Sequence, residues 1–183
     1  MAYRSGTYVA FYAQGTSDPA ESDMKYYNTL RMWDANKDLD FSFVNSHEKS
    51  RAVWDSSTKA TLEQVLKERL RNSKNMILII GQTTKYDRDW VPMEIAYSVD
   101  DCQIPIIAAY PDYDSILAPD QLSSLWPKAL ADRISDKSAR VIHIPFKQDP
   151  IKAAIKQFDH DNLPSGTLVY YTRETYIKWG LIK

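Results

Sequence analysis

Short apolar runs alternate with amphipathic stretches along most of the chain. Runs rich in β-branched, aliphatic and aromatic residues predict strands. The runs at residues 76–81 (MILIIG) and 104–111 (IPIIAAYP) are almost continuously apolar, which is typical of strands buried on both faces of a parallel sheet. The five predicted strands cover residues 7–13, 39–45, 76–81, 104–111 and 139–146.

Between these runs, apolar residues recur at helical spacing. A helix is predicted over residues 58–72, with charged residues opposite an apolar stripe that consists of Leu62, Val65, Leu66 and Leu70. The segment 119–135 should be helical in pieces that are broken at Pro127. Further helices are predicted at residues 24–36, from residue 89 onward, and at 149–161, the last with Asp149 as cap and Pro150 in first position. In the tail, two β-like runs flank residues 172–174 and predict a hairpin.

The repeated alternation of strand and helix predicts an α/β fold, a doubly wound parallel sheet of about five strands with helices on both faces. Residues 1–160 should form this domain, and residues 161–183 a short C-terminal extension packed on it. Ligands of such sheets bind beyond the carboxyl ends of the strands, near the point where the strand order reverses. The loops that follow Ala13, Asn45 and Gly81 are therefore expected to share one ligand-binding rim.

The helix that opens at residue 89 places a carboxylate beside an indole. Asp89 is its predicted N-cap, and Pro92 is tolerated in its first turn because the N–H it lacks would be unpaired there. Trp90 and Glu94, four residues apart, lie on one side of the helix. Residues with the same spacing form the adjacent buried stripe: Val91, Ile95 and Val99. Glu94 can be there because the helix dipole favours an acidic residue in the first turns, or because a partly desolvated carboxylate serves a site.

Composition narrows the classes of function. The chain has 183 residues, 44% of them apolar, and a net charge of −1, so it lacks the basic excess that binding to nucleic acid requires. Its one cysteine, Cys102, excludes an internal disulfide and a cysteine-based zinc site, and its three histidines show no metal-ligand spacing. No run reaches membrane-spanning length and the N-terminus lacks the pattern of a signal peptide. We expect a cytoplasmic protein that binds neither nucleic acid nor membrane, with no metal.

The segment SKNMILIIGQTTKYDRDWVPMEIAYSVDDCQIPIIAAYP, residues 73–111, resembles the TIR-like domains of bacterial anti-phage systems, in particular the TIR component of the Thoeris system. The shared pattern is a buried strand that ends in glycine, a threonine-rich loop, Trp-Val-x-x-Glu-Ile, and a second buried strand. The likeness extends more loosely back to the first strand and does not include the C-terminal tail. It implies a flavodoxin-like, TIR-like sheet, in agreement with the alternation above.

The resemblance also implies an activity, cleavage of the nicotinamide–ribose bond of NAD. Glu94 falls on the family's catalytic glutamate and Trp90 on its site tryptophan, and Phe11 and Tyr12 match positions that line the nicotinamide and ribose pocket. NAD would be the substrate, with no cofactor. The product would be an ADP-ribose-derived signal, cyclic in form, which activates a separate effector protein against phage. Self-association is expected, since TIR-like domains often complete their sites that way.

Other assignments stay open from the sequence. His47, in the loop after the second strand, could contact ribose or phosphate, or belong to a solvated loop. His143 alternates with Ile142 and Ile144 in the fifth strand and is expected to be a hydrogen-bonded core histidine. Two other functions compete with NAD cleavage: a nucleoside N-glycosyl transferase that uses Glu94, and a catalytically silent TIR-like scaffold.

Overall fold

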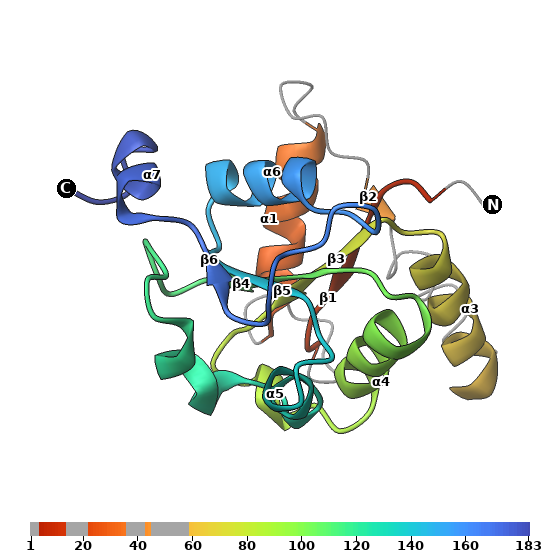
Figure 1. Ribbon diagram of the computed structural model, residues 1–183. Helices are drawn as coiled ribbons and strands as arrows, with labels where there is room; N and C mark the ends of the chain where they lie inside the picture. Colours follow the sequence, from red (N-terminus) through yellow and green to blue (C-terminus); the bar gives the residue numbers. More distant parts are fainter. Residues whose placement is uncertain (1–3, 14–21, 36–42, 45–58) are drawn as a thin grey trace.

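The computed structural model describes residues 4–13, 22–35, 43–44 and 59–183. They form one parallel sheet in the order β2-β1-β3-β4-β5-β6, seen in Figure 1. The five strands predicted from the apolar runs are confirmed, and a sixth, β6, joins the edge of the sheet beside β5. The strands are β1 (Thr7–Ala10), β2 (Phe43–Val44), β3 (Asn75–Ile79), β4 (Ile106–Tyr110), β5 (Val141–Pro145) and β6 (Val169–Tyr170).

Helices cover both faces of the sheet, as the alternation predicts (Figure 1). One face, here called the α4 face, is covered by α3 (Lys59–Arg71), α4 (Trp90–Ala96) and α5 (Lys128–Ser135). The opposite face, the α1 face, is covered by α1 (Met24–Ala35) and α6 (Gln148–Gln157). The described residues also include three short helical segments and a C-terminal helix: η1 (Thr84–Tyr86), η2 (Tyr97–Asp101), η3 (Pro119–Leu125) and α7 (Arg173–Lys178).

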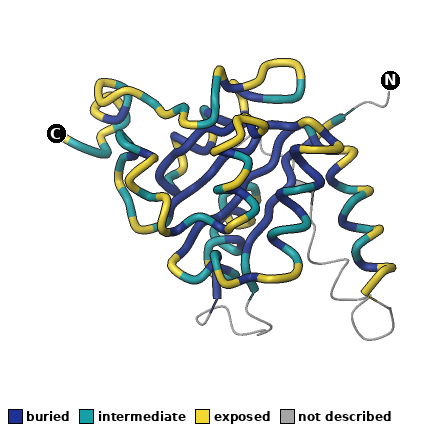
Figure 2. The backbone as a smooth tube through the Cα atoms, turned by 60° about the horizontal axis from the view of Figure 1, so that its bottom comes forward, coloured by how far each residue is buried: buried dark blue, intermediate teal, exposed yellow. Residues whose placement is uncertain are grey.

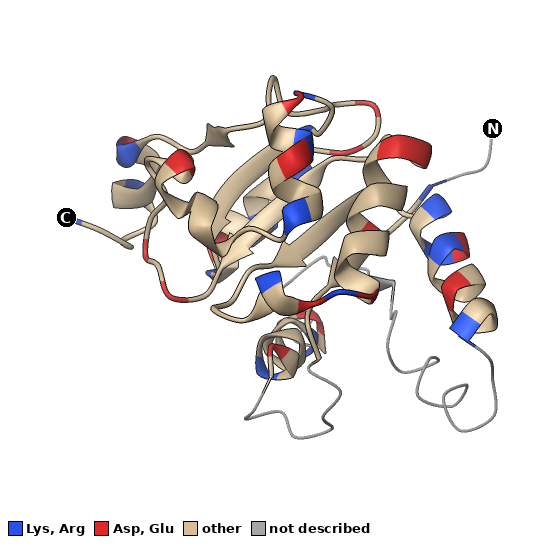
Figure 3. Cartoon of the chain, turned by 90° about the horizontal axis from the view of Figure 1, so that it is seen from below, with Lys and Arg blue, Asp and Glu red and all other residues tan. Residues whose placement is uncertain are grey.

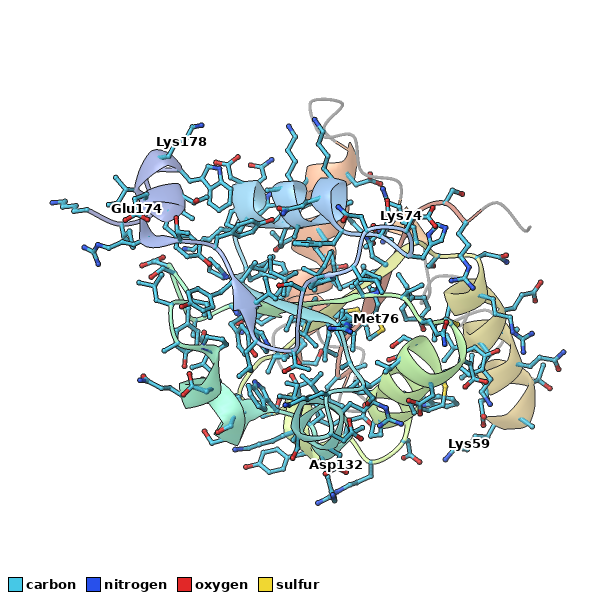
Figure 4. All side chains as sticks on the ribbon, viewed as in Figure 1. Lys59, Lys74, Met76, Asp132, Glu174 and Lys178 are labelled. Atoms are coloured by element: carbon cyan, nitrogen blue, oxygen red, sulfur yellow. The ribbon has the colours of Figure 1, made fainter. Side chains whose placement is uncertain are left out.

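The core consists of two apolar layers, one on each face of the sheet. Every residue of β3, β4 and β5 is buried, because strands covered on both faces have no polar side. Figure 2 shows this burial along the strands and the inner sides of the helices, and Met76 of β3 lies among packed side chains in Figure 4. None of the helices in the described part of the chain combines the length and apolar character needed to cross a bilayer.

One predicted helix break is confirmed, and one predicted helix start is displaced by two residues. Pro127 does separate two helical pieces, since η3 ends at Leu125 and α5 begins at Lys128. The start of α6 was predicted two residues too late, because Lys147 occupies the N-cap position and Asp149 and Pro150 are the second and third helical residues. Proline is tolerated there for the same reason as in first position: the first N–H groups of a helix have no partner within it.

The C-terminal tail does not form the predicted hairpin. Its first β-like run supplies β6, which pairs in parallel with β5, and the second is helical, as α7. Thr172 starts this helix, since its side chain accepts a hydrogen bond from the backbone N–H of Thr175, and this cap favours a helical turn over a tight strand reversal. Tyr176 of α7 is fully buried. The pairing of β6 with β5 and the buried Tyr176 both hold the extension against the domain.

The strand order reverses at β1, which lies between β2 and β3. Here the chain after β3 approaches the start of α1 so closely that a Cβ atom on Gly81 would lie 2.3 Å from Oδ1 of Asp23. Thr84 holds the two segments together: its hydroxyl donates to Asp23 Oδ2 at 2.7 Å and accepts from the N–H of Gly81 at 2.8 Å. Any side chain at position 81 would have to displace the buried Asp23 carboxyl that Thr84 holds, and the contact fixes the loop that leads into α4.

Candidate active site

The start of α4 is held by Asp87 rather than by the predicted cap, Asp89. The Oδ1 atom of Asp87 accepts hydrogen bonds from the backbone N–H groups of Asp89 at 2.8 Å and Trp90 at 3.0 Å. Asp89 makes no side-chain cap bond and instead pairs with Lys59 at 2.6 Å. The prediction failed because both residues are aspartates at the mouth of one helix, and only the turn geometry decides which carboxylate faces the free N–H groups.

Removal of the Asp87 carboxyl should destabilise this helix start. We expect Asp87→Ala to lower the free energy of unfolding by about 1–2 kcal/mol, because two backbone N–H groups lose their acceptor. Asp87→Asn is the matched control, since its amide oxygen can still accept both bonds. Urea unfolding curves of the three proteins measure the difference, and equal midpoints for the alanine and asparagine variants would contradict the capping role.

Glu94 is buried to a degree that the sequence did not indicate. Its side chain lies on the α4 face, and the residue is only 1% exposed, whereas a position at the edge of the core was predicted. Tyr8, fully buried in β1, donates its hydroxyl to Glu94 Oε1 at 2.5 Å. The other oxygen, Oε2, is buried and has no hydrogen-bond partner among the residues that the structure describes. A buried polar atom without a partner is uncommon in proteins and is retained mainly where strain or function explains it.

The environment of Glu94 keeps its carboxyl protonated at neutral pH. Burial raises its pKa from 4.5 to about 8, the Tyr8 hydroxyl partly opposes that rise, and the negative charge of Asp87 adds to it. Burial dominates because a charge loses its hydration in the apolar layer. A carboxyl whose pKa lies near the working pH can change its charge when a ligand arrives.

Trp90 lies one helical turn before Glu94 and is partly buried against the same apolar layer. The Lys59 ammonium is 5.7 Å from the centroid of its ring, and Figure 4 labels Lys59 at the edge of the molecule near the start of α3. The indole can therefore accept a cation on its face in this setting. Val91, Ile95 and Val99 are all buried, which confirms the predicted stripe.

The two aromatic residues after β1 point to opposite faces of the sheet. Tyr12 packs against the α4 face, the side of Glu94. Phe11 is 2% exposed and stacks on Tyr27 in the α1 layer, with ring centroids 5.0 Å apart. This separation follows from the two-residue alternation of side chains in extended backbone. Phe11 thus lies away from Glu94, while His47 falls outside the described residues.

Sequence reasoning missed three residues that the structure brings to this region, Tyr8, Asp87 and Asp23. Tyr8 shares the parity of Tyr12 along β1, so a search for polar atoms on the α4-facing side of that strand would have found its hydroxyl. Asp23 is 4% exposed, and burial raises the pKa of its carboxyl. The hydrogen bond from the Thr84 hydroxyl lowers that pKa and so opposes part of the rise. Asp23 and Gly81 are far apart in the sequence, so no local pattern predicts their contact.

His143 is the hydrogen-bonded core histidine that was predicted. Its Nδ1 atom lies 2.8 Å from the Tyr110 hydroxyl, and its Nε2 atom 3.0 Å from the carbonyl oxygen of Thr167. Trp126 donates its indole N–H to the same tyrosine hydroxyl at 2.8 Å. Burial lowers the pKa of His143 to about 4, so the ring is neutral at physiological pH and serves packing.

Two surface features bear on metals and on charged partners. Within the described residues, Asp159, His160 and Asp161 offer ligand atoms within 4.8 Å of one another. Asp159 Oδ1 already accepts hydrogen bonds from the backbone N–H groups of Asp161 and Asn162, both at 2.9 Å. These bonds explain the clustering of the three side chains as a turn, so we assign no metal to it. Along the coloured part of the ribbon in Figure 3, acidic and basic residues are interspersed.

Comparison with protein families agrees with this geometry. A family model of the Thoeris protein ThsB, TIR-like domain, matches residues 8–116. The matched part is more than half of the chain, runs from β1 to the segment after β4, and contains Tyr8, Trp90 and Glu94. It leaves β5, β6 and the C-terminal helices outside. The chain belongs to the TIR-like family of the Thoeris protein ThsB.

Proposed function

We propose that this protein cleaves the nicotinamide–ribose bond of NAD and produces an ADP-ribose-derived signal, cyclic in form, that activates a defence effector. Membership of the Thoeris family makes it a defence-related TIR protein, and such domains are known for chemistry on NAD. The observation that carries the proposal is Glu94 itself: a buried carboxyl with one oxygen held by Tyr8 and the other without a partner.

One carboxylate is chemically sufficient for this reaction. Glycosidases use two, since an alkoxide leaving group must be protonated. Nicotinamide leaves as a neutral pyridine that takes the electron pair of the broken C–N bond, so no acid is required. The ribose carbon becomes an oxocarbenium ion, and the Glu94 carboxylate would stabilise its positive charge and orient the ribose hydroxyls. A preorganised charge in a dry site contributes on the order of 3 kcal/mol to such a step.

The charge of the substrate suits the protonation state of Glu94. In NAD the nicotinamide ring is cationic, and a cation near a carboxyl favours its ionised form. Binding would thus release the proton that burial holds on Glu94 and create the anion where positive charge will develop. The half-buried Trp90 indole offers a face to the cationic ring, and Tyr12 lies on the same side of the sheet.

The fate of the oxocarbenium ion decides the product. Capture by water releases ADP-ribose and a proton, whereas capture by a nucleophilic atom of the same ADP-ribose closes a ring. Exclusion of water favours the second course. We further propose that copies of the chain associate to complete the site and that the effector is reached only through the released signal.

Incubation of the purified protein with NAD tests the proposal directly. Products are resolved by chromatography and mass spectrometry over a range of protein concentrations, because self-association is part of the proposal. Free nicotinamide is expected, and the mass of the second fragment distinguishes hydrolysis from cyclisation. Glu68→Gln, on an exposed position of α3, is the matched control and should leave turnover unchanged.

Intact NAD at every protein concentration, and after addition of lysate from phage-infected cells, would overturn the proposal. A panel of nucleosides would then test the transferase alternative. Binding partners captured with the full chain would test the alternative of a silent scaffold.

A further inference from the structure

We propose that Tyr8 is a positioning residue for Glu94: its hydroxyl holds Oε1, so that Oε2 is the oxygen that meets the hydroxyl groups of the ribose. This inference rests on the proposed function and deepens it by assigning separate tasks to the two carboxylate oxygens. It also gives a residue of the central sheet a part in the reaction.

The first support is the geometry of the contact. Tyr8 and Glu94 are 86 positions apart in sequence, and the hydroxyl of one lies 2.5 Å from Oε1 of the other. Both residues are almost completely shielded from solvent, Tyr8 at 0% and Glu94 at 1% exposure. Tyr8 belongs to β1, which pairs with β2 on one side and β3 on the other. These pairings fix the backbone that carries the Tyr8 ring.

The second support is the asymmetry of the carboxyl group. Oε1 has a donor, whereas Oε2 is buried and no donor reaches it from the described part of the chain. An ionised carboxylate accepts several hydrogen bonds, and in a dry site each missing donor leaves charge unsolvated. The ribose hydroxyls are donors of the right kind to fill the vacant side. Because Glu94 is 1% exposed, ligand binding must open the surface over Oε2.

The third support is that Tyr8 acts on the carboxyl in the direction that the chemistry needs. Its hydroxyl stabilises the charged form of Glu94, against the effect of burial and of Asp87. Without that donor the carboxyl would hold its proton more firmly, and a smaller fraction would be available as the anion. Tyr8 thus both orients the group and eases its ionisation, although it does not itself touch the reacting atoms.

Titration of the Glu94 carboxyl in Tyr8→Phe tests the first half of this role. Phenylalanine keeps the ring in the apolar layer and removes only the hydroxyl. The carboxyl carbon of Glu94, followed by ¹³C NMR and assigned with Glu94→Gln, should titrate about one pH unit higher than in the parent protein. Tyr176→Phe is the matched control: that tyrosine is also fully buried, and its hydroxyl donates to the carbonyl oxygen of Ile116 at 3.4 Å. It should leave the titration in place.

A second substitution at position 8 should shift the Glu94 titration in the opposite direction. It keeps the hydroxyl, so it tests the role even if the fold does not tolerate Tyr8→Phe. 3,5-Difluorotyrosine introduced at position 8 is a stronger donor, so the Glu94 carboxyl should titrate lower than in the parent. An unmoved midpoint in both Tyr8 variants, or an equal shift in Tyr176→Phe, would overturn the proposal.

Kinetics test the second half. In Tyr8→Phe we expect kcat to fall on the order of tenfold while KM changes little, because the interaction matters most when the carboxylate meets developing charge. The ascending limb of the pH–rate profile should shift to higher pH by the same amount as the NMR titration midpoint. A rise in KM at unchanged kcat would overturn the assignment. If the parent protein releases no nicotinamide, the proposed function fails, while the titration still decides whether Tyr8 controls Glu94.

Discussion

Glu94→Gln is expected to lower the rate of nicotinamide release by roughly a hundred- to a thousandfold, the effect of removing one preorganised stabilising group from a dry active site. Glutamine has the same shape, and its amide oxygen can still accept the Tyr8 hydroxyl. It cannot become an anion, so the oxocarbenium ion loses its nearby negative charge. Because the positive charge on the ribose carbon develops only as the C–N bond breaks, the loss should appear more in kcat than in KM.

The measurement is initial nicotinamide release at saturating NAD, with each variant at the same protein concentration. Glu68→Gln carries the same chemical change on an exposed helical position and should match the parent. Residual turnover above about a tenth of the parent rate would contradict the role given to Glu94, because that loss corresponds to only about 1.4 kcal/mol.

The second large effect concerns stability. Between pH 5 and pH 8 the unfolding free energy of the parent protein should fall relative to that of Glu94→Gln. Burial raises the pKa of Glu94 in the folded chain from 4.5 to about 8, so over this window the unfolded chain has lost the proton while the folded chain retains it. Stability therefore decreases as pH rises. The full difference between the two pKa values corresponds to about 5 kcal/mol.

Urea unfolding of both proteins at unit steps from pH 5 to pH 9 measures this difference. Subtraction of the Glu94→Gln curve removes the titrations that the two proteins share, so the remaining slope belongs to position 94. Parallel curves would mean that Glu94 is solvated in the free protein, and the buried geometry would then be wrong.

Much of the architecture could be read from local patterns. The almost continuous apolar runs that became β3 and β4 have few alternatives, since a strand exposed on one face would alternate apolar with polar residues. The tail was harder: residues 169–178 contain β-like side chains in both halves, and the Thr172 cap selected a helix for the second half. At the start of α4, two neighbouring aspartates were equivalent by spacing, and the turn selected Asp87.

For the site, the sequence by itself determined the one-turn pairing of Trp90 with Glu94 and its place after the most apolar strand, because helical spacing and strand burial are properties of neighbouring residues. Tertiary structure alone decided that Tyr8 meets Glu94 Oε1, that Oε2 is left without a partner, and that Phe11 faces away while Tyr12 does not. Contacts across 86 positions depend on the order of strands and on which face each side chain takes. The charge state of Glu94 follows from that burial, which no local pattern specifies.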